Sequence, residues 1–150
     1  MSRTMACAAT SLCLSASLLG AQRQQAVPKA PATNVVYTSS ATASYAKAPD
    51  SPITTAPLFG NANADAPHGE FITFPPNFDA GGWHVHTNTV NIVVLKGAYV
   101  YRDENGEKRV GPGEFIRIAG GHRHWSGSDA KEGAVFYQHQ QARMDLKTVK

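Results

Sequence analysis

The sequence predicts an all-β domain of the sandwich or barrel type over residues 53–150. Short runs of β-branched and aromatic residues follow one another through this stretch, and turns rich in Gly, Pro and Asn separate them. No helical period extends over two turns there. Such a succession of short strands is typical of antiparallel sandwiches and barrels, and about 100 residues suffice for one compact core.

The expected strands lie in apolar or alternating runs that turn residues interrupt. In chain order these runs cover residues 69–76, 83–86, 90–103, 115–119 and 133–140. Asn105-Gly106 follows the longest run, and this dipeptide tolerates positive φ, which favours a type I′ hairpin turn. We therefore expect a hairpin around residues 104–108.

Residues 1–21 have the layout of a secretory signal peptide. Arg3 lies in a short leading region, a moderately apolar stretch spans 5–19, and the small residues Gly20 and Ala21 precede a polar run. The apolar stretch is too short and too rich in Ser and Thr for a stable membrane span. We expect the protein to be secreted or periplasmic, and a disordered cytosolic extension is the alternative.

Residues 22–52 are expected to form a flexible linker. Ala, Pro, Ser and Thr dominate the stretch without a sustained apolar period, so it cannot bury enough surface to offset chain entropy. One short strand within residues 34–40 could lie at the edge of the domain. Both cysteines belong to the expected signal peptide, so its removal would leave no disulfide and no thiolate metal site.

The charge balance argues against a nucleic-acid partner. Residues 1–49 carry four Lys or Arg and no acidic residue, whereas residues 50–150 carry ten Lys or Arg and eleven Asp or Glu. The net charge of +3 therefore belongs to the N-terminal segment, and the domain is near neutral. A nucleic-acid surface needs an excess of cations. The domain sequence also lacks the motifs of serine hydrolases, phosphate loops and dinucleotide sites.

Two His-x-His pairs, which hold four of the six histidines, predict a metal site. In a strand, His84 and His86 would share one face at a spacing of about 7 Å along the chain, so their imidazoles can converge on one ion. His122 and His124 form a second pair after a glycine-rich turn. A ligand from a distant strand is what closes such a site, but the spacing alone leaves open which member of the second pair contributes.

The other histidines and the two tryptophans receive simpler interpretations. His68 stands between a Pro and a Gly, which predicts a solvated loop position, and His139 is interpreted as a strand-edge or surface residue. Trp83 and Trp125 each adjoin a candidate ligand, so alternation sends them to the opposite face. We expect both tryptophans to serve packing or a dimer interface.

The spacing of the histidines and glycines resembles the two motifs of the cupin superfamily, whose members are small jelly-roll barrels, or double-stranded β-helices. The first motif is matched by His84, His86 and Gly97, while Phe78 stands in its leading glycine position and Val90 in its glutamate position.

The second motif selects one histidine of the second pair. Gly113, Gly121 and His124 match it, with Ala119 in its proline position and Ser128 in its asparagine position. The resemblance covers about residues 55–146. It implies a single-domain cupin of the three-histidine type that lacks the glutamate, with His84, His86 and His124 as the metal ligands.

Three neutral imidazoles would leave a divalent ion with its full 2+ charge, which favours an anionic, chelating ligand. Nitrogen donors suit several metals, among which Fe(II) and Zn are favoured here. With Fe(II) the site resembles three-histidine cupin dioxygenases. With Zn it lacks a confident general base, because Glu70 and Glu114 both look like strand-end charges. Side chains of suitable type to orient the imidazoles are Thr87, Asn88, Asn91 and Gln138.

Three functional hypotheses remain. The first is a metal-dependent enzyme of the dioxygenase type that acts on a small chelating organic anion. The second is a non-catalytic cupin that binds or senses a small molecule, and the third is a purely structural dimerisation module. A homodimer is expected in each case, since it could cover any strand face left apolar. The fold alone does not choose among them, because it hosts many unrelated functions.

Overall fold

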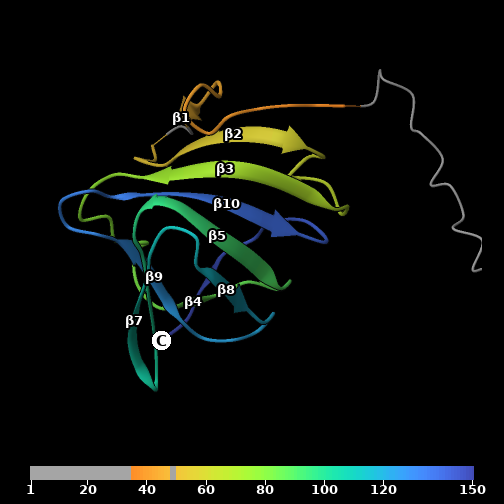
Figure 1. Ribbon diagram of the computed structural model, residues 1–150. Coiled ribbons are helices and arrows are strands. Elements are labelled where there is room, and N and C mark those ends of the chain that lie inside the picture. Colours follow the sequence, from red (N-terminus) through yellow and green to blue (C-terminus); the bar gives the residue numbers. More distant parts are fainter. Residues whose placement is uncertain (1–34, 48–49) are drawn as a thin grey trace, which may run out of the picture. The chain divides into compact units, whose positions relative to one another are not determined.

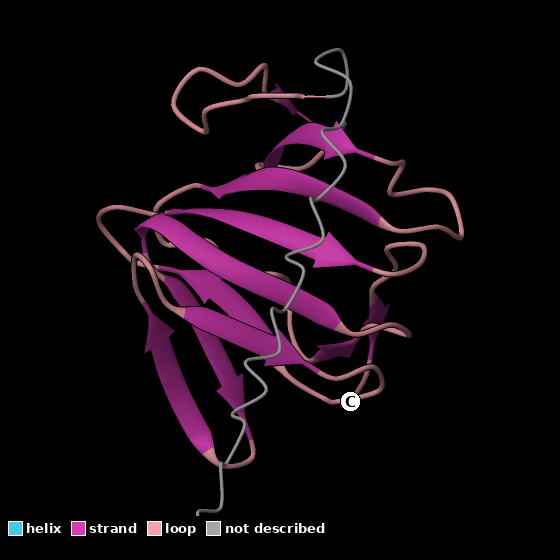
Figure 2. Cartoon of the chain, turned by 45° about the vertical axis from the view of Figure 1, so that its right-hand side comes forward, coloured by secondary structure: helices cyan, strands magenta, loops and turns pink. Residues whose placement is uncertain are grey.

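The described residues, 35–47 and 50–150, form eleven β-strands in this computed structural model (Figure 1). The strands are β1 (Ala46–Lys47), β2 (Thr54–Phe59), β3 (His68–Phe74), β4 (His84–Val85), β5 (Val90–Gly97), β6 (Tyr99–Asp103), β7 (Gly106–Val110), β8 (Phe115–Ile118), β9 (Trp125–Ser128), β10 (Ala134–Gln140) and β11 (Lys147–Thr148). This part of the chain contains no helix (Figure 2), and so none that is long and apolar enough to cross a membrane. The all-β prediction is confirmed. The expected signal peptide, residues 1–21, and residues 22–34 of the expected linker lie outside the described residues.

The strands pair antiparallel in three sheets. The largest has the order β1-β2-β3-β10-β5-β8, and the smaller ones are β7-β6-β9 and β11-β4. In Figure 1, β2, β3, β10 and β5 lie side by side, and β4, β7 and β9 lie on the other side of the domain. The chain passes from one sheet to another after β3, β4, β5, β7, β8, β9 and β10, as in a double-stranded β-helix. Buried apolar side chains from both sides form the core.

Alternation along β3, β10 and β5 decides which side chains face that core. Phe136 on β10 is paired in register with Ile72 on β3 and with Val94 on β5, and all three are buried. The ring of Phe136 packs edge-on against Phe74, with ring centroids 4.9 Å apart. Burying such a side chain contributes about 1.5–3 kcal/mol to the free energy of unfolding. The cluster around Phe136 therefore provides much of the stability.

His68 differs from its prediction. It was expected in a solvated loop, but it is the first residue of β3 and only 2% of its surface is exposed. The strand begins one residue earlier than the expected apolar run, and alternation then turns His68 inward together with Glu70 and Ile72. The loop prediction was wrong because a neighbouring Pro and Gly do not report the pairing of His68 with Gln140.

Part of the stretch expected as linker takes part in the sheet. The compact unit begins at Val36, and β1 pairs with β2 through Ala46 opposite Thr55. The short strand proposed within residues 34–40 does not form in the described residues 35–40, where the first four are exposed.

The hairpin predicted around residues 104–108 is confirmed, but its turn type is not. Asp103 pairs with Gly106, so Glu104 and Asn105 are the two turn residues. A type I′ turn needs positive φ at both of them, whereas only Gly106 adopts it, at 123°. The Asp103 carboxylate accepts a hydrogen bond from the Asn105 amide at 2.8 Å and thereby supports the alternative turn.

The expected run 90–103 divides at Gly97, where the chain leaves the large sheet. Gly97 has a φ of +67°, and a Cβ there would lie 2.1 Å from the Gly133 carbonyl oxygen. Only glycine combines this backbone conformation with so close an approach. The motif glycine therefore allows β5 to pass into β6.

Candidate metal centre

Three histidines converge inside the barrel, next to β4. His84 lies on β4, His86 follows it, and His124 precedes β9. Two backbone hydrogen bonds join His84 and His124, at 2.8 and 3.0 Å. One ring nitrogen from each of the three lies within 4.8 Å of the others, and the side chains are at most 7% exposed. The cluster could therefore hold a metal ion.

The outer nitrogen of each ring is held by a main-chain carbonyl. Nδ1 of His84 donates to the Gly82 oxygen at 3.0 Å, Nδ1 of His124 donates to the His122 oxygen at 2.9 Å, and Nδ1 of His86 donates to the Asp145 oxygen. A carbonyl can only accept, so each Nδ1 carries the hydrogen and each Nε2 keeps its lone pair. Metal-binding imidazoles are oriented in this way in proteins.

The Nε2 atom of His124 is buried and has no hydrogen-bond partner among the described residues. Leaving such an atom unsatisfied costs about 1–3 kcal/mol. Burial also lowers the pKa of His124 to about 4 and lowers the pKa of His86, so both rings are neutral at pH 7. Neutral nitrogen donors with free lone pairs fit Fe(II), Zn and similar divalent ions.

His122, the other member of the second pair, points elsewhere. Its Nε2 lies 3.2 Å from the Asp103 carboxylate, which also accepts a hydrogen bond from the Tyr101 hydroxyl at 2.9 Å. The Tyr101 ring stacks on both His122 and His124, with centroid distances of 6.4 and 5.7 Å. The structure therefore brings together the three histidines that the motif spacing selects and leaves His122 outside the cluster.

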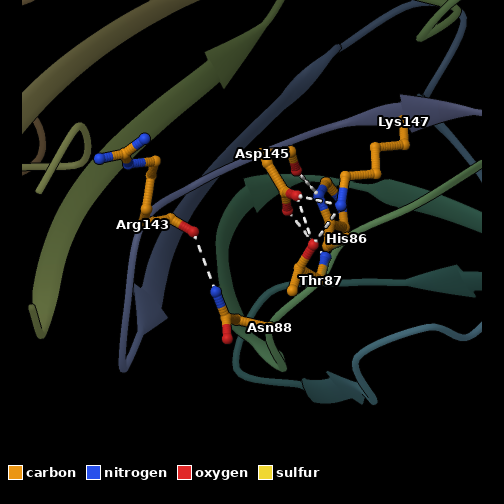
Figure 3. A network of polar contacts seen from close by, with 6 residues as sticks. All are labelled: His86, Thr87, Asn88, Arg143, Asp145 and Lys147. Carbon is orange, nitrogen blue, oxygen red and sulfur yellow. Dashed lines mark hydrogen bonds and ion pairs between the residues drawn. The ribbon is translucent and has the colours of Figure 1, made fainter. Parts of the chain in front are cut away.

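The C-terminal residues 141–150, here called the C-terminal segment, hold His86 in place (Figure 3). The Asp145 carboxylate accepts hydrogen bonds from the Thr87 amide at 2.7 Å and from the Thr87 hydroxyl at 2.5 Å, while its main-chain oxygen faces His86. Lys147 lies 3.3 Å from the same carboxylate. β11 extends this attachment, because it pairs with β4.

Sequence reasoning missed this role of Asp145. It sought groups to orient the rings among Thr87, Asn88, Asn91 and Gln138, yet main-chain carbonyls hold all three rings. Asn88 instead donates to the Arg143 carbonyl at 3.2 Å, which Figure 3 also shows. No local pattern could reveal the contact with Asp145, because it lies 59 residues from His86 along the chain.

A cavity of about 240 Å³ adjoins the histidines. Most of its wall is apolar, and Met144 and Leu146 of the C-terminal segment contribute to it. Its wall also contains polar residues, which are Ser51, Thr55, Glu70, His84, His86, Tyr99, Ser126 and Gln138. The Ser126 hydroxyl lies 2.6 Å from the Tyr99 hydroxyl and 3.4 Å from Nε2 of His84. A small, mostly apolar molecule could reach the histidine cluster here.

Neither tryptophan lines this cavity. Arg102 stacks over Trp125 with its guanidinium carbon 4.5 Å from the ring centroid, and Arg123 stacks over Trp83 at 4.0 Å. These contacts agree with the expected packing role.

Comparisons with known proteins agree with this geometry. The family model described as Cupin domain matches residues 70–138, which contain all three clustered histidines. The polyketide cyclase RemF from Streptomyces resistomycificus has a similar structure, with a TM-score of 0.64 and 20% identity over 77% of this chain and 86% of that one. An uncharacterised conserved protein with a double-stranded β-helix domain from Klebsiella pneumoniae has a TM-score of 0.60 and 13% identity over 82% of this chain and 98% of that one. KdgF from a Halomonas species has a TM-score of 0.53 and 16% identity over 67% and 89%.

At these identities the solved structures share the fold alone. A comparison with curated protein sequences finds no significant match. The matching family model, the double-stranded β-helix and the similar structures nevertheless agree with one another: residues 70–138 match the cupin family, and the described part of the chain has the cupin fold.

Proposed function

We propose that this protein is a small metal-binding cupin in which His84, His86 and His124 hold one divalent ion. The orientation of the rings carries the proposal. Each Nδ1 is bound to a main-chain carbonyl, and the Nε2 of His124 is buried without a partner among the described residues. The ligands would thus be held in place before the ion binds.

The adjoining cavity is the proposed binding site of a small organic molecule. Three neutral ligands leave the charge of a divalent ion uncompensated, which favours an anionic or chelating group at that end of the cavity. Fe(II) and Zn are the favoured ions. A bound ion would polarise an oxygen of the ligand and, if it is iron, could also engage dioxygen.

A metal-dependent enzyme of the dioxygenase type, acting on a small chelating organic anion, is the first candidate function. The cavity is largely apolar and shielded in part by the C-terminal segment, as a site that limits the access of water requires. Similar structures include a protein named as a polyketide cyclase, which supports small-molecule chemistry on this fold. A binding or sensing cupin without turnover is the second candidate.

We also propose that residues 1–21 direct export, so that the protein works as a secreted or periplasmic homodimer without nucleic-acid partners. The layout of residues 1–21 supports export. The near-neutral charge of residues 50–150 supports the absence of nucleic acid. Partly exposed apolar residues on the outer face of the large sheet, such as Leu95 and Phe115, support self-association.

Metal binding is tested first, by elemental analysis of protein purified after growth with Fe, Zn, Mn and Ni and by titration of stripped protein with Zn²⁺ and Co²⁺. We expect about one equivalent per chain and a loss of affinity of more than about 100-fold in His124→Ala, which removes a ligand outright. His139→Ala is the matched control and should bind as the wild type does. Less than a tenth of an equivalent, with no uptake on titration, would refute the proposal.

Oxygen consumption then separates the two candidate functions. The iron-loaded protein is screened with small chelating anions such as 2-oxo acids and β-dicarbonyls. Consumption that disappears in His124→Ala supports the enzyme. Saturable binding of the same compounds without oxygen consumption or product supports the binding or sensing protein.

A further inference from the structure

Glu70 is a buried carboxyl group that faces the same cavity as the histidine cluster. It lies on β3 between His68 and Ile72 in the inward-facing series, and only 8% of its surface is exposed. The sequence predicted an ordinary strand-end charge, which the structure contradicts. The glutamate that the first motif lacks at Val90 thus has a counterpart in this cavity, supplied by another strand.

The surroundings of Glu70 leave its carboxyl group free for a ligand. Within residues 35–47 and 50–150, no hydrogen bond to the carboxylate forms, and no Lys or Arg lines the cavity. Gln138 on β10 is its partner in register. The other titratable groups that face the cavity are His84, His86 and Tyr99, and His68 is the neighbour on the same strand.

Burial raises the pKa of Glu70, and the nearby His68 opposes this effect. A carboxyl group with a raised pKa is a stronger base than an ordinary glutamate, which favours its use in general acid–base catalysis. Buried carboxyl groups that only stabilise a fold are instead bound to a cation or to backbone amides. Glu70 makes no such contact with the described residues.

We propose that Glu70 is the proton-transfer residue of this site and acts on a small carbonyl compound held at the histidine cluster. The inference rests on the proposed metal site. The Glu70 carboxylate takes a proton from the carbon next to the carbonyl, so that the C–H bond breaks and an O–H bond forms. The electron pair moves to the carbonyl oxygen to give an enolate, and Glu70 can return the proton. No oxidant or reductant is consumed in this step.

The cavity indicates the class of compound. His84 and His86 of the cluster line the cavity, and an ion held there would favour a chelating oxygen group, while Phe74, Phe78 and Leu146 contribute apolar parts of the wall. A 2-oxo acid with a short branched hydrocarbon tail combines these properties. 4-Methyl-2-oxopentanoate is therefore a suitable probe, since its methylene group lies beside the carbonyl.

The test follows exchange of that methylene group in D₂O by ¹H NMR with Zn-loaded protein. We expect the wild type to accelerate exchange and Glu70→Gln to reduce its rate at least about 100-fold, in the range of a lost general base. Binding of Co²⁺, and of the probe to the Co²⁺-loaded protein, is read from the visible absorption spectrum and should stay within about threefold of the wild type. Glu114→Gln removes the other carboxylate that the sequence pointed to and should exchange as the wild type does.

The outcomes separate this inference from the metal proposal. If the wild type takes up no Co²⁺, the metal site fails and the inference fails with it. If the metal and the probe bind but the wild type catalyses no exchange, or Glu70→Gln exchanges as fast as the wild type, Glu70 has no such role. If Glu70→Gln loses both metal binding and exchange, the proton-transfer role of Glu70 is also overturned. Glu70→Asp, which keeps a carboxylate, should retain part of the rate and excludes a folding defect as the cause.

Discussion

The two ends of the barrel interior differ in chemistry although the same strands build them. At one end, the inward residues of β3 and β10 are Ile72, Phe74, Ala134 and Phe136. At the other end they are His68, Glu70, Gln138 and Gln140, which are equally buried. The strand geometry does not change between the ends. Alternation therefore determines that a residue faces inward, and its identity decides whether that end supports the fold or binds a ligand.

The polar end carries a cost that the apolar end offsets. The buried atoms without a hydrogen-bond partner in the described part of the chain are Nε2 of His68, Nε2 of His124 and Oε1 of Gln140. Each such atom costs about 1–3 kcal/mol. A barrel filled with apolar residues would avoid this cost. For Nε2 of His124, the proposed metal ion would supply the missing partner.

The largest expected effect is a loss of stability when a side chain of the apolar end is truncated. Phe136→Ala removes a ring that packs against Phe74 and Tyr99, with centroids 4.9 and 5.3 Å away, and should lower the free energy of unfolding by about 3–5 kcal/mol. Urea denaturation measures it. At the polar end, Gln140→Met should change the same free energy by less than about 1 kcal/mol, because it also removes an unsatisfied oxygen. If Phe136→Ala and Gln140→Met lost equal free energy of unfolding, the two ends would not differ in their contribution to stability.

The second effect is a loss of stability of the metal-free protein in acid. His124 has a pKa of about 4 in the folded state against 6.5 in the unfolded chain, so the unfolded chain binds more protons between these values. Stability should therefore fall as the pH falls from 6.5 to 4, by roughly 3 kcal/mol for a shift of this size, and no further below 4 on this account. Denaturation midpoints at a series of pH values measure the slope.

The control for this effect is His124→Gln, which has no imidazole at this position and should show a shallower slope. Carboxyl groups whose pKa is lowered by hydrogen bonds, such as Asp129, lose their stabilising effect mainly as the pH falls through and below their usual 3.8, at the lower edge of this window. An unchanged slope in His124→Gln would show that other groups cause the acid sensitivity.

The smallest effect concerns the attachment of the C-terminal segment. Asp145→Ala removes the carboxylate that Thr87 holds, so the main-chain oxygen no longer fixes Nδ1 of His86. Loss of such an orienting contact lowers metal affinity about 10- to 100-fold, which Co²⁺ titration measures. Lys147→Met is the matched control at the same rim, where the side chain is 63% exposed, and should change affinity less than about threefold. Equal affinity in the two variants would leave Asp145 without a positioning role.

Much of the fold could be predicted because its signals are local. Alternating apolar residues and the Gly, Pro and Asn turns located most strands, and the Asn105-Gly106 region located a hairpin. The errors arose where pairing between distant strands decides the outcome. His68 and Glu70 look like surface residues in the sequence, but pairing of β3 with β10 buries both.

The sequence by itself determined the all-β architecture, because strand alternation is a property of short segments, and the resemblance to the two cupin motifs linked His84 and His86 with His124. Only the tertiary structure decided that His122 faces Asp103, that Asp145 orients His86 and that Glu70 shares the cavity with the cluster. Each of these contacts joins residues at least 14 positions apart, and no local pattern records such a distance. The closure of the barrel brings them together.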